Sequence, residues 1–130
     1  MFDLEKDPKG FVRLTISGQI DEAEMRSGLD AFLNILSDDG KTDFLYTISD
    51  FAMPELSAIA VEFGYIPRLL SSIPKIGRVA VIADAAWLRQ AAEIEGLLLP
   101  GMTIESFSPG HEADAEAWLM GGEGPDRTAV

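Results

Sequence analysis

The fold is decided by residues 77–84, which read GRVAVIAD. Valine, isoleucine and alanine fill the centre of this segment almost without interruption, which is typical of a strand covered on both faces in a parallel sheet. Other segments rich in β-forming residues precede and follow it. They lie at residues 2–5 (FDLE), 11–18 (FVRLTISG), 43–50 (DFLYTISD) and 102–108 (MTIESFS). A tight turn separates the first two, so we expect an antiparallel hairpin whose first strand lies at the edge of the sheet.

Apolar residues recur at helical spacing between the later strands and after the last one. The helices predicted in this way lie at residues 21–36, 54–70, 85–95 and 110–120. Strands that alternate with helices require right-handed crossovers between parallel neighbours. We therefore predict a single α/β domain at residues 1–122, with a mainly parallel sheet of about five strands and four helices. The remaining residues, 123–130, have no apolar stripe and are expected to form a flexible tail.

The second predicted helix is the most apolar. The stripe expected along it comprises Leu56, Ile59, Ala60, Phe63, Ile66, Leu69 and Leu70. Pro67 lies inside this stripe and has no N–H for the carbonyl of Phe63, which predicts a break or kink that begins near Ile66. Two interpretations stay open: a doorway for a ligand or partner, and a plain kink that lets the helix follow the sheet.

The composition limits the classes of function. Among 130 residues, 22 are acidic and 10 basic, and the net charge of −12 argues against nucleic acid as a partner. The chain has no cysteine and one histidine, which excludes disulfides, thiolate metal sites and any site that needs two imidazoles. The N-terminal residues do not resemble a secretory signal, and the apolar runs are too short for a membrane span. We expect a cytoplasmic protein without integral membrane association.

Motifs for catalysis are missing from the sequence. Neither a glycine-rich phosphate loop nor a serine-hydrolase elbow is present. His111 stands at the start of the last predicted helix, where an exposed side chain is expected. A candidate metal site is formed by three residues that each follow a strand, Asp50, Asp84 and His111. The alternative is that the aspartates are helix caps, because an aspartate after a strand commonly caps the next helix. The sequence thus predicts no enzyme, no cofactor and no metal.

Two groups of residues are candidates for binding a ligand or partner. The first lies at the carboxyl ends of the strands, where open α/β sheets bind ligands, and comprises Asp50, Pro54, Asp84 and Trp87. Capping by the aspartates and core packing by Trp87 are the alternative interpretations. The second flanks Pro67 and comprises Phe63, Ile66 and Arg68.

Arg68 also belongs to a basic stretch, because residues 64–83 hold Arg68, Lys75 and Arg78 and no acid. These cations could face an anionic ligand. Alternatively, they complement the dipole of a helix C-terminus and the neighbouring acidic helices.

Two segments resemble a known family. Residues 75–92 (KIGRVAVIADAAWLRQAA) and 101–119 (GMTIESFSPGHEADAEAWL) are similar to the SpoIIAA-like group of small bacterial proteins, which is related in fold to STAS and CRAL-TRIO domains. The resemblance covers roughly residues 1–120 and implies a STAS-like fold. STAS anti-sigma-factor antagonists carry a phosphorylatable serine in an Asp-x-Ser-Gly context. Residues 50–54 read DFAMP, so only the aspartate matches, and no phosphorylation switch is expected there or at Ser57.

Two hypotheses of function follow. The first is a non-enzymatic binding or protein-interaction module, whose partner is another protein, with a homodimer left open. The second is a small apolar-ligand or lipid-binding protein. In that case the ligand would be a small apolar anion, with its charge at Arg68 and its apolar part beside the flanking aromatic and aliphatic residues.

Overall fold

Consecutive strands of the chain are also neighbours in space, because the sheet has the order β1-β2-β3-β4-β5. The computed structural model describes residues 1–36, 40–51, 55–83 and 103–121. The side chains of residues 50 and 51 are not among the described parts. In chain order the elements are β1 (Phe2–Lys6), β2 (Val12–Gly18), α1 (Glu22–Ile35), β3 (Thr42–Phe51), α2 (Leu56–Ser72), the 3-10 helix η1 (Ile73–Lys75), β4 (Ile76–Ile82), β5 (Thr103–Phe107) and α4 (Glu112–Leu119).

The sheet is mixed. β1 pairs antiparallel with β2, with Phe2 opposite Ile16, and this confirms the antiparallel edge strand expected from the sequence. The other three neighbouring pairs are parallel. The description as mainly parallel is therefore corrected to mixed, because the N-terminal hairpin adds an antiparallel pair to the crossover units.

The helices number three in the described residues, with one short 3-10 helix, where four α-helices were expected. The segment expected to form the remaining helix, residues 85–95, lies outside the described residues, as does the expected tail at 123–130. α1 begins as predicted, since the Asp21 side chain accepts a hydrogen bond from the backbone N–H of Glu24 at 2.8 Å. Such a cap satisfies one of the free donors in the first turn.

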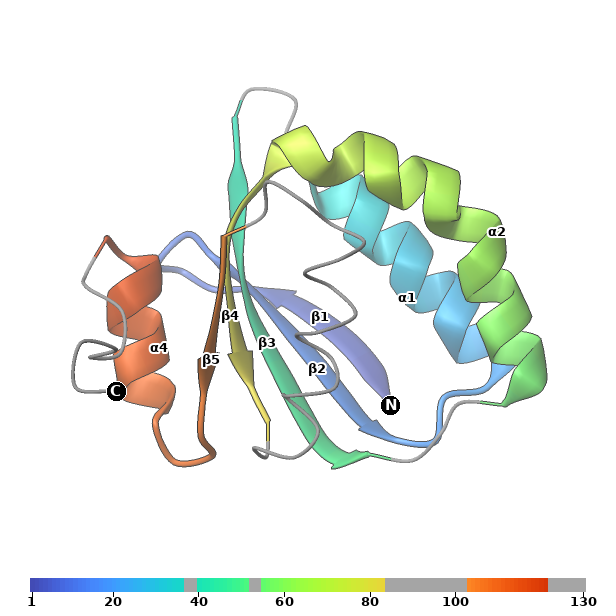
Figure 1. Ribbon diagram of the computed structural model, residues 1–130, viewed down its shortest axis with the longest axis horizontal. Coiled ribbons are helices and arrows are strands. Elements are labelled where there is room, and N and C mark those ends of the chain that lie inside the picture. Colours follow the sequence, from blue (N-terminus) through green and yellow to red (C-terminus); the bar gives the residue numbers. More distant parts are fainter. Residues whose placement is uncertain (37–39, 52–54, 84–102, 122–130) are drawn as a thin grey trace.

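Helices cover both faces of the sheet (Figure 1): α1 and α2 lie on one face and α4 on the other. Successive residues of a strand point to opposite faces, so each strand contributes to two clusters. Leu45 and Ala80 pack towards α4, whereas Phe44 and Val79 pack in the cluster that includes α1 residues.

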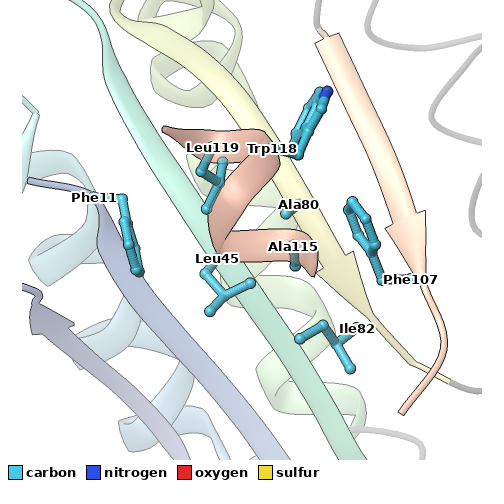
Figure 2. Close-up of a cluster of buried hydrophobic side chains, with 8 residues drawn as sticks. All are labelled: Phe11, Leu45, Ala80, Ile82, Phe107, Ala115, Trp118 and Leu119. Atoms are coloured by element: carbon cyan, nitrogen blue, oxygen red, sulfur yellow. The ribbon is translucent and has the colours of Figure 1, made fainter. Parts of the chain in front are cut away.

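The cluster beneath α4 joins β3, β4, β5 and Phe11, which directly precedes β2, to the last helix (Figure 2). Its buried members are Phe11, Leu45, Ala80, Ile82, Phe107, Ala115, Trp118 and Leu119. Trp118 is a core residue, because it is 5% exposed and the centroid of its ring lies 6.2 Å from that of Phe107. Arg78 of β4 also binds this helix, since its Nη1 donates a hydrogen bond to the Trp118 carbonyl oxygen at 2.6 Å.

α2 is continuous through Pro67, so the predicted break is wrong. Pro67 denies a hydrogen bond to the carbonyl of Phe63, but Phe63 is exposed and water can reach this turn. Tyr65 and Leu69, on either side of the proline, pack in the cluster with α1. Tertiary packing therefore holds both halves of the helix against α1 despite the missing bond.

Candidate functional site

α2 turns an unexpected side towards α1. Its buried residues are Ala58, Tyr65 and Ser72, and Val61 and Leu69 are partly buried in the same contact. Of the stripe predicted from the sequence, only Leu69 packs against this cluster in the described part of the chain. The predicted core face is thus wrong for five exposed residues, whereas Ile59 is half-buried; the five are Leu56, Ala60, Phe63, Ile66 and Leu70. Apolar side chains surround α2, so packing against α1, and not hydrophobicity, selects the buried side.

The opposite side of α2 presents large apolar side chains to solvent. Leu56 is 84% exposed, Phe63 66%, Ile66 37% and Leu70 45%. Leu56, Phe63 and Leu70 are spaced by seven residues, or about two helical turns, and therefore lie along one line. We call these four residues the outer face of α2. Single exposed apolar residues are ordinary, but four on one helix face form a patch.

A groove of about 450 Å³ separates the outer parts of α1 and α2. It is lined by Glu22 and Arg26 of α1 and by Ser57, Ala60, Val61, Gly64, Tyr65 and Arg68 of α2. A Cβ placed on Gly64 would meet no atom within 4 Å beyond its own helix backbone, so the space above this residue is open. We call this space the α1–α2 groove.

Tyr65 organises one wall of the α1–α2 groove. Its hydroxyl donates to Asp30 Oδ1 at 2.5 Å, which ties α2 to α1. The guanidinium carbon of Arg68 lies 4.3 Å from the centroid of the Tyr65 ring. The hydrogen bond to Asp30 and burial raise the pKa of Tyr65, while the nearby charges of Arg68 and Arg26 act in the opposite direction. Both guanidinium groups therefore lie close enough to influence the same hydroxyl.

The structure separates the residues predicted to flank a doorway at Pro67. Phe63 and Ile66 lie on the outer face, whereas Arg68 lines the α1–α2 groove. Arg68 follows Phe63 by five residues, which is about 140° around the helix axis. Phe63 and Ile66 therefore lie on a different side of α2 from Arg68.

The other predicted candidates cannot be placed as a site. The backbone of Asp50 stands at the end of β3, as expected. Its side chain, together with Pro54, Asp84 and Trp87, lies outside the described residues.

Sequence reasoning missed Arg26 and the role of Ser57 in this groove. The α2 residues that line it follow the helical spacing 57, 60, 61, 64, 65, 68. Small residues at that spacing were a visible signal. The contribution of Arg26 was not visible, because only the packing of α1 against α2 brings it there.

A second cavity, of about 440 Å³, lies at the amino ends of β3 and β4. Asp43 Oδ1 accepts a hydrogen bond from the backbone N–H of Arg78 at 2.7 Å, and Lys41 Nζ approaches the Ile76 carbonyl at 3.5 Å. Arg78 also lies 5.0 Å from the centroid of the Trp118 ring. This agrees with the interpretation that Arg78 complements a helix C-terminus, because its side chain donates to the last turn of α4.

The described residues contain no group of three or more potential ligands that could hold a metal ion. His111 lies at the surface, with Nδ1 3.1 Å from Asp114 Oδ2 and side chains 60% and 71% exposed. By length and composition, residues Leu56–Lys75 would suit a membrane span, and 22% of that window is buried. Here the segment includes α2, one side of which is the core contact with α1.

Comparison with known proteins identifies the fold. A family model described as SpoIIAA-like matches residues 11–120. An uncharacterized protein from Shewanella loihica PV-4, of the DUF3478 family with a SpoIIAA-like fold, superposes with a TM-score of 0.70 at 16% identity, over 92% of each chain. The Bacillus cell fate determinant SpoIIAA in its phosphorylated form gives a TM-score of 0.48 at 17% identity, over 87% of this chain and 96% of the other. Comparison with curated proteins gives no match.

Proposed function

Because the chain belongs to the SpoIIAA-like family, as the segments 75–92 and 101–119 predicted, we propose that it is a non-enzymatic protein-interaction module that docks its partner on the outer face of α2. The observation that carries this proposal is the exposure of Leu56, Phe63, Ile66 and Leu70 along one side of a single helix. Large apolar side chains in this arrangement are stabilised when a partner removes them from water.

Phe63 is the natural anchor of this face. Its ring is 66% exposed, and aromatic side chains are enriched among the residues that dominate binding energy. Ile66 and Leu70 follow it by three and seven residues, which is the anchor spacing of a helix that inserts into an apolar groove. We therefore expect the partner to offer an apolar groove or helix surface of its own.

Two further observations support a binding role without catalysis. The lone histidine is exposed, and its Nδ1 lies 3.1 Å from the exposed carboxylate of Asp114. The net charge of −12 disfavours nucleic acid and leaves a protein as the better class of partner.

A photo-crosslinking amino acid placed at Phe63 tests this proposal in cells. The matched control carries the same group at Met120, which is 58% exposed but lies just beyond α4. We expect a defined cross-linked protein at position 63 and none at position 120, and Leu70→Ser should abolish it. The partner is then purified, and Phe63→Ala should weaken its affinity by about tenfold or more. Equal cross-linking at both positions would refute the docking face.

A second copy of the chain is one outcome of this experiment. The cross-linked product would then contain only the chain itself, and light scattering would give twice the monomer mass of 14.1 kDa. In that case the partner is identified as the protein itself, and the interaction is a homodimer built on α2.

A small apolar ligand or lipid is the second candidate, and the same exposed side chains favour it, because an acyl chain would also be buried against them. The mechanism expected from the sequence loses support, since α2 has no break at Pro67 and Arg68 is turned away from Phe63. Native mass spectrometry of freshly purified protein distinguishes the two functions. A co-purified acyl species favours a lipid, and bare protein that gains no mass from a lipid extract excludes it.

A further inference from the structure

The geometry points to an oxyanion-binding site in the α1–α2 groove: we infer that a small molecule with a carboxylate or phosphate group binds there between Arg26 and Arg68. This site differs from the docking face, because none of the four residues of the outer face lines the groove. The inference does not depend on the proposed function.

Arg68 is prepared for an external anion. Its guanidinium stacks on the Tyr65 ring at 4.3 Å, yet no carboxylate of the described residues pairs with it, in a chain with 22 acidic groups. A stacked guanidinium keeps its N–H donors available at the edge of its plane, in a fork that matches carboxylate and phosphate oxygens. The cation is therefore held in place without being neutralised.

The support for Arg68 is itself fixed. The Tyr65 residue is 6% exposed, and its hydroxyl donates to Asp30 at 2.5 Å. Asp30 belongs to α1 and Tyr65 to α2, so this hydrogen bond joins the two helices beside the groove. Pre-organisation of this kind lowers the entropic cost of binding, because the side chain is ordered before the ligand arrives.

Arg26 supplies the second cation from the α1 wall. Its Nη2 lies 3.1 Å from Glu22 Oε1, one turn earlier in α1, and both side chains are about half exposed. An exposed pair between neighbouring turns of one helix is weak, so an incoming oxyanion can share or replace Glu22. Arg26 and Arg68 line the same groove from its two walls.

The groove also has room for the body of a ligand. Its volume of about 450 Å³ falls within the usual range for small-molecule sites. Gly64 and Ala60 have small side chains, so the α2 wall of the groove leaves space for a ligand. The Ser57 hydroxyl adds a polar group on the same helix. A ligand with one anionic group and a short apolar part matches this lining of two arginines, a serine and small aliphatic residues.

Titration of the full-length protein with inorganic phosphate and with butyrate tests the inference, followed by amide and arginine NMR signals at constant ionic strength. We expect saturable shifts at Ser57, Gly64 and Arg68. Arg26→Gln and Arg68→Gln should each weaken the affinity by about tenfold, as expected for a charge-assisted bidentate contact. Lys6→Gln is the matched control, because it removes an exposed positive charge from β1 and should leave the affinity unchanged.

Arg68→Gln also removes the stacking of Arg68 on Tyr65, so a third variant is needed that leaves this contact in place. Gly64→Leu fills the groove but keeps both arginines, so it should abolish the shifts while the unfolding midpoint shows a folded protein. Shifts that do not saturate, or that are equal in wild type and Arg68→Gln, would overturn the site.

Binding to lipid vesicles distinguishes a lipid headgroup from a soluble anion as the ligand. If phosphatidylglycerol vesicles bind and phosphatidylcholine vesicles do not, with the binding lost in Arg68→Gln, the oxyanion belongs to a lipid headgroup. If free phosphate or butyrate binds and neither vesicle does, the ligand is a soluble metabolite. Either result supports the groove, whereas absence of binding in all arms refutes it. Cross-linking at Phe63 should persist in Arg68→Gln, so the two proposals can fail separately.

Discussion

Gly28 of α1 lies directly against the aromatic ring of Phe2 in β1, so closely that a Cβ at this position would overlap the ring atoms. The absence of a side chain at Gly28 lets the first helix approach the edge strand. Phe2 is one of the partly buried residues that pack against the cluster of α1 and α2. The contact thus fixes the N-terminal hairpin to the helical layer.

Gly28→Ala should therefore destabilise the protein. Alanine favours a helix over glycine by about 1 kcal/mol, but displacement of the Phe2 ring is an overpacking effect of about 1–3 kcal/mol. Gly64→Ala is the matched control, because its Cβ meets open space in α2, and it should gain about 0.5–1 kcal/mol. Urea unfolding of both variants measures the difference. Equal changes would show that Phe2 does not depend on Gly28.

Phe63→Ser should leave stability within about 0.5 kcal/mol of wild type, because the side chain is 66% exposed. Ala58→Leu should cost about 1–3 kcal/mol, because Ala58 is fully buried against α1. Thermal unfolding of the two variants checks which side of α2 is the core. A large loss for Phe63→Ser with a tolerated Ala58→Leu would reverse the assignment of the two faces.

The Asp7–Arg13 pair should make part of the free energy of unfolding depend on pH, with a loss of stability at low pH. The backbone N–H of Lys9 and the Arg13 side chain each donate to Asp7 at 2.8 Å and lower its pKa below the ordinary 3.8. The folded state therefore binds this proton more weakly than the unfolded state. The contribution is complete above pH 3.8 and is lost as the pH falls through the lowered pKa. In Asp7→Asn, the unfolding midpoint should vary less between pH 5 and pH 2 than in wild type.

Glu62→Gln should stabilise the protein at neutral pH. Partial burial raises the pKa of the Glu62 carboxyl above its ordinary 4.5, so the ionised group opposes folding. The penalty falls as the pH drops through the raised pKa and disappears well below pH 4.5, where the carboxyl is protonated in both states. We expect a higher unfolding temperature for the variant at pH 7 and equal temperatures at pH 3.5. An advantage of the same size at both values would contradict an effect of charge.

The strands were predictable because their signal is local. The strand predicted at 77–84 is observed at Ile76–Ile82, and that predicted at 102–108 is observed at Thr103–Phe107. Alternating or continuous β-branched residues specify these segments without reference to the rest of the chain. The edge hairpin followed from its short turn for the same reason.

The orientation of α2 was not predictable in this way. Its apolar residues occur on every side, so the hydrophobic pattern does not distinguish the core face from the outer face. The buried side is set by Ala58, whose small side chain permits close packing, and by Tyr65, whose hydroxyl finds Asp30 on another helix. The α1–α2 groove was not predictable for the same reason, since only the tertiary structure brings Arg26 and Arg68 to the same groove.

The order in which the strands occur also has a consequence for synthesis on the ribosome. Each new strand is added to an edge that the preceding one has just formed, so no strand waits for a partner made much later. The cluster that joins α1 to α2 draws all its members from residues 1–72. The cluster beneath α4 requires Leu119 as well as Phe11. The emerging chain can therefore build its first hydrophobic layer early, and the face covered by α4 is closed last.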